Sequence, residues 1–216
     1  NSLKNYLIYP NELRKILKSK STKIIDCRWF LGQPRKGLLE YRKSHIPGAF
    51  HFDMEKISNE NTNLPHMLPN RSKFLSMISK YGILKKNLIV IYDQNGFFCS
   101  ARIWFTFFIY GFKKVKILDG GFKIWKKKKF TISRLIPLKK YKFSKIDVIK
   151  NQIIKKNEIK ILKKKKKEHL IIDARPKDRF LGKTPEPRPE IKSGNIPKSI
   201  NIPFNKITDK EGRLLN

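Results

Sequence analysis

The chain has 216 residues, of which 39% are hydrophobic and 12% aromatic, so it has enough apolar side chains for a buried core. Its 50 Lys and Arg against 17 Asp and Glu give a net charge of +33, a balance that could suit nucleic acid or an anionic membrane. The lysines are spread along the chain without a recognised nucleic-acid module, and no apolar run could span a bilayer, so we expect neither partner.

Apolar periodicity predicts helices and strands that alternate along the first 130 residues. The expected helices cover residues 12–18 with Asn11 as N-cap, 72–81 with Ser72 as N-cap, 99–110 and 122–127. The expected strands cover residues 23–27, 50–54, 88–92 and 115–118. The run 88–92 is the most continuous apolar segment and is expected to be the central strand. This alternation predicts an α/β fold with a mainly parallel sheet flanked by helices.

Several residues in this region are expected to have structural roles. Asp26 and Arg28 follow a buried strand and are expected to tie a loop together, and His45 lies in a Pro-Gly turn where a structural role is expected. Cys99 near Arg102 could be a nucleophile with a lowered pKa, but its aromatic-rich helix favours an inert buried thiol. The two cysteines offer no disulfide framework or paired metal spacing, which favours a reducing, cytoplasmic setting.

The chain repeats part of itself. Asp173 and Arg175 repeat the spacing of Asp26 and Arg28, and both pairs are followed by Phe-Leu-Gly and then by an Ile-Pro turn. The offset between the two aspartates is 147 residues, a period that indicates two copies of one domain. We therefore expect a first domain over 1–130, a linker over 131–150 and the start of a second copy over 151–216. Two complete copies need roughly 280 to 300 residues, so the chain is expected to be a fragment.

Short segments spread over nearly the whole chain point to one family by their order and spacing. They are Ile25–Trp29, His45–Ala49, His66–Pro69, Tyr92–Asp93 with Ser100–Trp104, Leu118–Phe122, and Asp173–Arg175 through Pro185–Arg188. Together they resemble the tandem-domain rhodanese-family sulfurtransferases, in particular those that use 3-mercaptopyruvate. The resemblance implies a rhodanese-like fold whose first copy is catalytically silent and whose second copy carries a cysteine nucleophile.

The implied reaction moves sulfur from a small anionic donor, 3-mercaptopyruvate or thiosulfate, through a cysteine persulfide. The acceptor would be a thiol, for example on a thioredoxin-like protein, or cyanide, and no organic cofactor or metal is implied. Arg179 and Arg188 correspond to the arginines that grip the donor's carboxylate and carbonyl, a task that suits the guanidinium fork. Glu55 and His66 correspond to an acidic residue and a histidine that support the active site, although the family usually has Asp where this chain has Glu55.

The nucleophile itself is expected outside this chain. Asp93 stands where the active copy would have its cysteine, and an offset of 150 places the counterpart near residue 243, beyond Asn216. We therefore expect no catalytic residue among the 216 and no sulfurtransferase activity from them alone. The alternative hypothesis is a non-catalytic tandem rhodanese module that binds partners or small anions. The residue near position 243 discriminates between the two.

Overall fold

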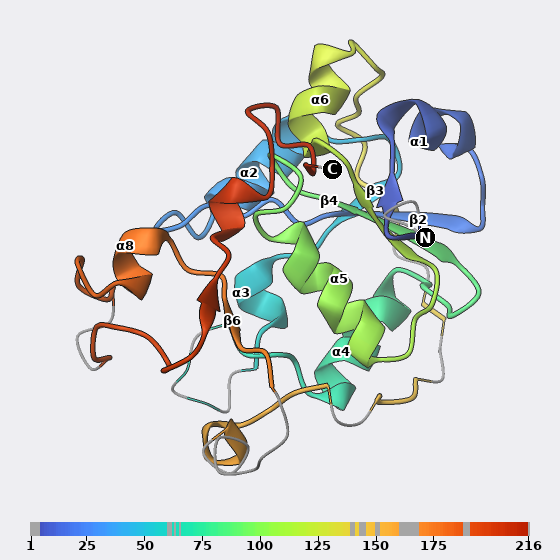
Figure 1. Cartoon of the computed structure of the whole chain (residues 1–216). Coiled ribbons are helices and arrows are strands. Elements are labelled where there is room, and N and C mark those ends of the chain that lie inside the picture. Colours follow the sequence, from blue (N-terminus) through green and yellow to red (C-terminus); the bar gives the residue numbers. More distant parts are fainter. Residues whose placement is uncertain are drawn as a thin grey trace. The chain divides into compact units, whose positions relative to one another are not determined.

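The structure, a computed structural model, describes residues 5–59, 62, 64, 66–138, 141–142, 146–149, 152–159, 169–187 and 191–215. Arg188, one of the two expected donor-binding arginines, therefore lies outside the described residues. The chain divides into two compact units, residues 1–150 with 211–213, and residues 151–210 with 214–216 (Figure 1). We describe each unit by itself. No helix among the described residues is long and apolar enough to cross a membrane.

A five-stranded parallel sheet forms the centre of the first unit, in the order β1-β5-β4-β2-β3. The strands are β1 (Leu7–Ile8), β2 (Thr22–Asp26), β3 (Ala49–His51), β4 (Leu88–Tyr92) and β5 (Val115–Leu118). The central position of β4 confirms the prediction from its apolar run, because a strand covered on both faces needs apolar side chains at successive positions. The α/β fold with a parallel sheet is likewise confirmed.

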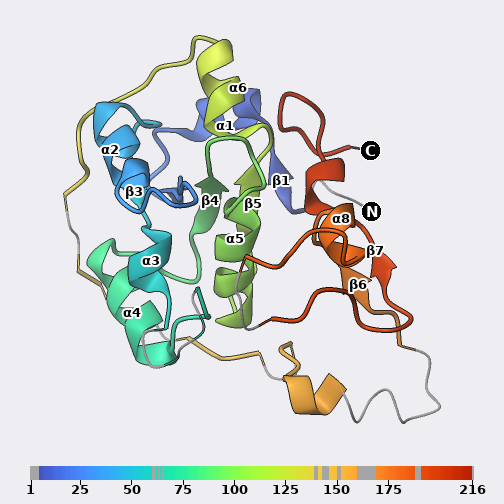
Figure 2. The ribbon, with the colours of Figure 1, turned by 90° about the vertical axis from the view of Figure 1, so that its left-hand side faces the viewer.

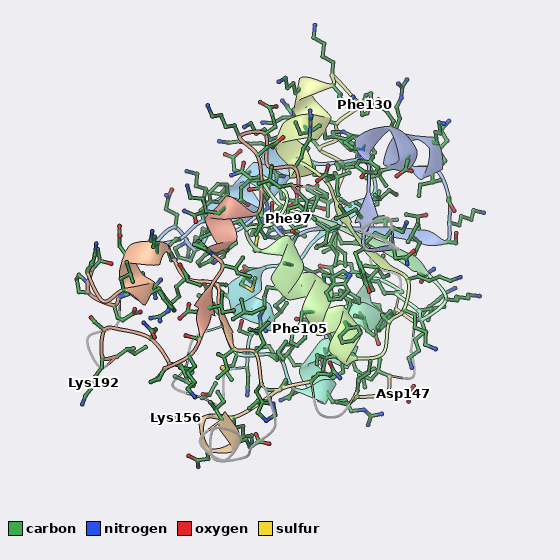
Figure 3. The ribbon with its side chains drawn as sticks, in the orientation of Figure 1. Phe97, Phe105, Phe130, Asp147, Lys156 and Lys192 are labelled. Carbon is green, nitrogen blue, oxygen red and sulfur yellow. The ribbon has the colours of Figure 1, made fainter. Side chains whose placement is uncertain are left out.

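Helices cover both faces of this sheet (Figure 2). They are α1 (Pro10–Ile16), α2 (Lys36–Lys43), α3 (Met54–Ile57), α4 (Arg71–Lys80), α5 (Ser100–Ile109) and α6 (Gly121–Lys127). On one face Ile25 and Ile91 pack with residues of α3, α4 and α5, and on the other Ile24 and Val90 pack with residues of α1 and α6. Neighbouring strand residues thus serve opposite layers of the core. Phe105 lies on α5, with Phe97 in the loop before it (Figure 3).

Two predicted helix starts were wrong, because a residue that favours the start of a helix more strongly lies one or two positions earlier in the sequence. Helix α1 begins at Pro10, whose fixed φ and missing N–H suit the first turn, and Glu12 accepts the N–H of Tyr9 at 2.9 Å. Asn11 is therefore not the N-cap. Helix α4 is capped by Asn70 instead of Ser72, and the Asn70 side chain accepts the N–H of Lys73 at 2.8 Å.

The strand expected over 50–54 is also corrected. It ends at His51, because Asp53 caps helix α3 by accepting the N–H of Glu55 at 3.1 Å. Strand β1 and helix α2 were not predicted: β1 has only two residues, and α2 buries only Gly37 and Tyr41, too few apolar positions for a visible period.

The described part of the second unit is smaller. It contains the parallel strands β6 (Ile172–Asp173) and β7 (Ile200–Asn201), helix α8 (Lys177–Phe180) and a 3-10 turn η2 (Phe204–Lys206). Ile172 pairs with Ile200, and in the first unit Ile25 pairs with Phe50. Ile172 lies 147 residues after Ile25, and Ile200 lies 150 residues after Phe50, which are the offsets between the two copies of the repeat. The two pairs of strands therefore have the same register. Lysines such as Lys156 and Lys192 project outward from the ribbon (Figure 3).

Candidate functional site

Glu55 and His66, predicted from sequence to support the active site, meet in the first unit. The His66 Nε2 atom lies 3.0 and 3.1 Å from the two Glu55 carboxylate oxygens, and the Trp29 indole N–H donates to Oε1 at 2.8 Å. Burial alone would raise the pKa of Glu55, but the hydrogen bonds from His66 and Trp29 bring it below its usual value. The longer Glu side chain therefore makes the contact with His66 despite its departure from Asp.

The backbone of His66 is held in an unusual conformation. Its φ of 57° lies in the left-handed region, which is uncommon for a residue other than glycine. The Arg102 guanidinium donates to the His66 carbonyl oxygen at 2.5 Å, and burial lowers the pKa of Arg102. Arg102 thus fixes the carbonyl of His66, whose ring contacts Glu55.

Trp29 is held from two sides. Its carbonyl accepts a hydrogen bond from the Gln94 side chain at 2.9 Å, and its ring stacks on Phe98 with centroids 6.0 Å apart. The ring also meets His66 edge to face, with centroids 5.1 Å apart. Trp29, Glu55 and His66 therefore form one group of side chains, which we call the Trp29–Glu55–His66 cluster.

The loop after β4 is closed on itself by Asp93. The buried Asp93 carboxylate accepts backbone N–H groups from Asn95 at 2.9 Å, Cys99 at 2.8 Å and Ser100 at 2.9 Å, and a further one from Gly96. Amides at the start of a helix otherwise attract anions. In this unit the Asp93 carboxylate takes the place of such an anion.

Neither cysteine is placed to react. Cys27 and Cys99 are 0% and 2% exposed, and the Cys99 thiol donates to the Cys27 carbonyl oxygen at 2.7 Å. Burial raises the pKa of Cys27 well above its usual value. For Cys99, its contact with Cys27 would lower the pKa, but burial and the carboxylates of Asp93 and Asp26 outweigh that contact and raise it. The prediction that Cys99 is a buried, inert thiol is confirmed as regards burial.

The Asp26–Arg28 tie is confirmed. Both side chains are buried, and the Arg28 Nε and Nη2 atoms donate to the carboxylate at 2.7 to 3.1 Å while Nη2 also reaches the Ser44 carbonyl oxygen at 2.6 Å. His45 is buried as well, with its two ring nitrogens 2.7 and 3.0 Å from backbone carbonyl oxygens. These contacts support the structural roles expected for all three residues.

The second unit shows the same tie with an addition. Arg175 donates to Asp173 and, at 2.8 Å, to the Gly194 carbonyl oxygen, as Arg28 does to its partners. Its remaining Nη1 group donates to Glu186 at 2.7 Å. Glu186 has a side chain only 3% exposed and also accepts from Arg179 Nη2 at 2.5 Å. The hydrogen bond from Arg179 brings the pKa of Glu186 below its usual value against the opposing effect of burial.

This arrangement leaves part of Arg179 available. The Arg179 side chain is 31% exposed, and its contacts to Glu186 use Nη2 and, at 3.5 Å, Nε. No hydrogen bond from Nη1 occurs within the described part of the chain. A guanidinium fixed along one edge can present its other N–H groups to a carboxylate without paying the full cost of ordering its side chain.

Sequence reasoning did not assign roles to Trp29 and Glu186, and it considered Arg102 only as a neighbour that could lower the pKa of Cys99. Trp29 contacts Glu55 and His66, which lie 26 and 37 residues after it, so no local sequence pattern predicts these contacts. Glu186 lies between two prolines in a loop, where only the neighbouring Arg188 drew attention. Within the described residues, no group of three or more His, Cys, Asp or Glu side chains could hold a metal ion.

Comparison with known proteins adds a family and several relatives. Residues 9–128 match the family described as the rhodanese-like domain. The chain is 35% identical over 195 residues to a probable 3-mercaptopyruvate sulfurtransferase of Schizosaccharomyces pombe, covering 88% of this chain and 65% of that protein. It is 34% identical over 220 residues to thiosulfate/3-mercaptopyruvate sulfurtransferase 1, mitochondrial, of Arabidopsis thaliana, covering 92% and 58%.

A solved structure agrees in fold. The crystal structure of a 3-mercaptopyruvate sulfotransferase from Escherichia coli superposes with a TM-score of 0.86 and 27% identity, covering 98% of this chain and 79% of that one. The chain spans 65% and 58% of the length of the two curated relatives named above.

Proposed function

The chain belongs to the rhodanese family, and on this premise we propose that the complete protein is a sulfurtransferase. It takes sulfur from 3-mercaptopyruvate or thiosulfate onto a cysteine as a persulfide and passes it to cyanide or to a thiol, for example on a thioredoxin-like protein. The observation that carries the proposal is Arg179, which is held by the nearly buried Glu186 and whose Nη1 makes no hydrogen bond within the described residues. The names of the relatives support the choice of donors.

In this proposal the first unit is the catalytically silent copy of a repeated domain. A carboxylate at position 93 cannot carry transferable sulfur, and it occupies the amides that would stabilise an anion there. The nucleophile belongs to the second copy, at the counterpart of Asp93. The residue boundaries that we propose are 1–130 for the silent copy, 131–150 for the linker and 151–216 for the start of the second copy.

The 216 residues alone are inactive in this proposal. They contain two cysteines, both buried and both with a raised pKa, whereas sulfur transfer requires an accessible thiolate. Two free cysteines, of which the Cys99 thiol donates to the Cys27 carbonyl oxygen, also fit a reducing compartment such as the cytoplasm.

Donor recognition falls to Arg179 and Arg188. A 3-mercaptopyruvate molecule has a planar carboxylate and an adjacent ketone, and two guanidinium groups can hold both at once. Glu55 and His66 support the active site, with the Glu55 carboxylate fixing the histidine ring.

A second candidate is a non-catalytic rhodanese module that binds partners or small anions. The burial of both cysteines favours it for the 216 residues taken alone. It differs from the first proposal in predicting that a longer chain also lacks a reactive cysteine.

The test compares thiocyanate formation from 3-mercaptopyruvate and cyanide by the 216-residue chain and by the complete protein. We expect turnover by the complete protein only, and the same turnover in its Cys27→Ser and Cys99→Ser variants. A complete protein that is folded but inactive with both donors would favour the non-catalytic module. Turnover by the 216-residue chain that disappears in Cys99→Ser would show that Cys99 is the nucleophile.

A further inference from the structure

The hydrogen bonds of the Trp29–Glu55–His66 cluster have only one possible direction. An indole N–H can only donate, so Glu55 Oε1 must accept from Trp29. An ionised carboxylate can only accept, so His66 Nε2 must carry the proton that it shares with Glu55. In the neutral imidazole the lone pair is then on Nδ1, which makes no hydrogen bond within the described part of the chain.

We propose that Trp29 is a positioning residue that orients the Glu55 carboxylate and thereby fixes His66 as its Nε2–H tautomer, with Nδ1 left to accept a proton or a hydrogen bond. The inference deepens the proposed function, on which it rests, because it assigns the working nitrogen of a histidine proposed to support the active site. It concerns Trp29, which the resemblance to the family did not assign.

The need for such a residue follows from exposure. The Glu55 and His66 side chains are 41% and 34% exposed, so water competes for the carboxylate and their contact alone is weak. Trp29 contributes a second donor to the carboxylate oxygen Oε1 and covers the His66 ring edge to face. Because Phe98 and Gln94 contact Trp29 in turn, Trp29 connects the carboxylate to the loop after β4.

Arg102 completes the restraint from the backbone side. It binds the carbonyl oxygen of His66, whose φ of 57° would otherwise relax toward the ordinary regions. Arg102 thus restrains the backbone of His66, and Glu55 restrains its ring through Nε2. Both contacts favour the orientation in which Nδ1 is the nitrogen that does not bind Glu55.

The first test uses the three indole N–H signals of the 216-residue chain in ¹H–¹⁵N NMR spectra. The signal lost in Trp29→Phe identifies Trp29. We expect it to titrate together with the Glu55 carboxylate and to stop titrating in Glu55→Gln. The other two indoles donate to the backbone carbonyls of Val115 and Thr131 and serve as controls that do not move.

The second test reads the His66 tautomer from ring ¹⁵N shifts, with His66→Gln to identify the signal. We expect Nε2–H to predominate in the native chain and in Phe98→Leu, which changes the packing of Trp29 but keeps its N–H. Trp29→Phe should give a mixture of tautomers. An unchanged tautomer in a folded Trp29→Phe chain would overturn the proposal.

In the complete protein, Trp29→Phe should lower kcat about tenfold with little change in KM, the order of effect of one hydrogen bond to a charged group. An unchanged kcat in an active enzyme would contradict the role of Trp29 in that reaction. An inactive wild-type protein would instead contradict the proposed function and leave the tautomer result standing, so the two failures are distinguishable.

Discussion

Arg179 immediately precedes Phe-Leu-Gly in the second unit as Trp29 does in the first, and each of these two side chains donates a hydrogen bond to a glutamate. The donor is neutral in the first unit and cationic in the second. A neutral donor can orient Glu55 without competing for its charge, so Glu55 remains able to bind His66. The cation also has N–H groups on Nη1, which makes no hydrogen bond in the described part of the chain, and this suits an anionic ligand. One position in the repeated pattern thus has two different chemical uses.

The two Asp–Arg ties allow a matched stability experiment. Arg28→Ala leaves Asp26 charged, buried and without its main partner, so we expect the first unit to lose about 3 to 5 kcal/mol of unfolding free energy. Arg175→Ala removes the corresponding tie from a more exposed place, where the side chains are 27% and 14% exposed. All three tryptophans lie in the first unit, so denaturant unfolding followed by tryptophan fluorescence should shift in Arg28→Ala and stay unchanged in Arg175→Ala. Equal shifts would contradict this account.

The ion pairs of Glu186 predict an acid transition in the second unit. The pKa of Glu186 and that of Asp173 are both lowered, chiefly by hydrogen bonds from Arg179 and Arg175 respectively. A carboxyl whose pKa is lowered in the folded state stabilises that state above its unfolded pKa, about 4 for these groups. This contribution is lost as the pH falls through the lowered values. Arginine Nε–H signals followed by NMR should therefore keep their chemical shifts at pH 5 and move toward those of an unpaired arginine only below about pH 4. Such a change already near pH 6 would mean that these contacts do not hold the arginines.

Arg188 and Arg179 should differ in their effect on donor choice. Arg188→Ala in the complete protein removes one charge-assisted contact to a keto acid, about 1.5 to 3 kcal/mol. That corresponds to a roughly ten- to hundred-fold loss of kcat/KM for 3-mercaptopyruvate, with a much smaller loss for thiosulfate. Arg179→Ala should impair both donors. If Arg188→Ala instead lowers kcat/KM equally for both donors, Arg188 supports its loop without reading the carboxylate.

The sequence was sufficient for features that depend on local pattern. The apolar run 88–92 predicted the central strand, and the residue types of Asp26 and Arg28 at a buried strand end predicted their tie. Helix starts failed where several capping residues compete within a few positions, as with Pro10 against Asn11 and Asn70 against Ser72. Helix α2 escaped prediction because it packs mainly through Tyr41.

The site was predictable only in part, because its contacts join residues that lie far apart in the sequence. Glu55 and His66 came from a family resemblance, and the structure brings them together at 3.0 Å. The contact of Trp29 with Glu55 joins the loop after β2 to helix α3, and only the folded chain decides which side chains meet there. Glu186 was not singled out in the sequence, because only the neighbouring Arg188 drew attention and the contact of Glu186 with Arg179 depends on how the loop folds.

The location of the persulfide tests the central claim most directly. After the complete protein reacts with 3-mercaptopyruvate in the absence of an acceptor, peptide mass spectrometry locates the cysteine that has gained one sulfur atom. The account predicts a cysteine in the second copy, at the counterpart of Asp93, with Cys27 and Cys99 unmodified. Sulfur on Cys99, or on no cysteine of a folded protein, would contradict it.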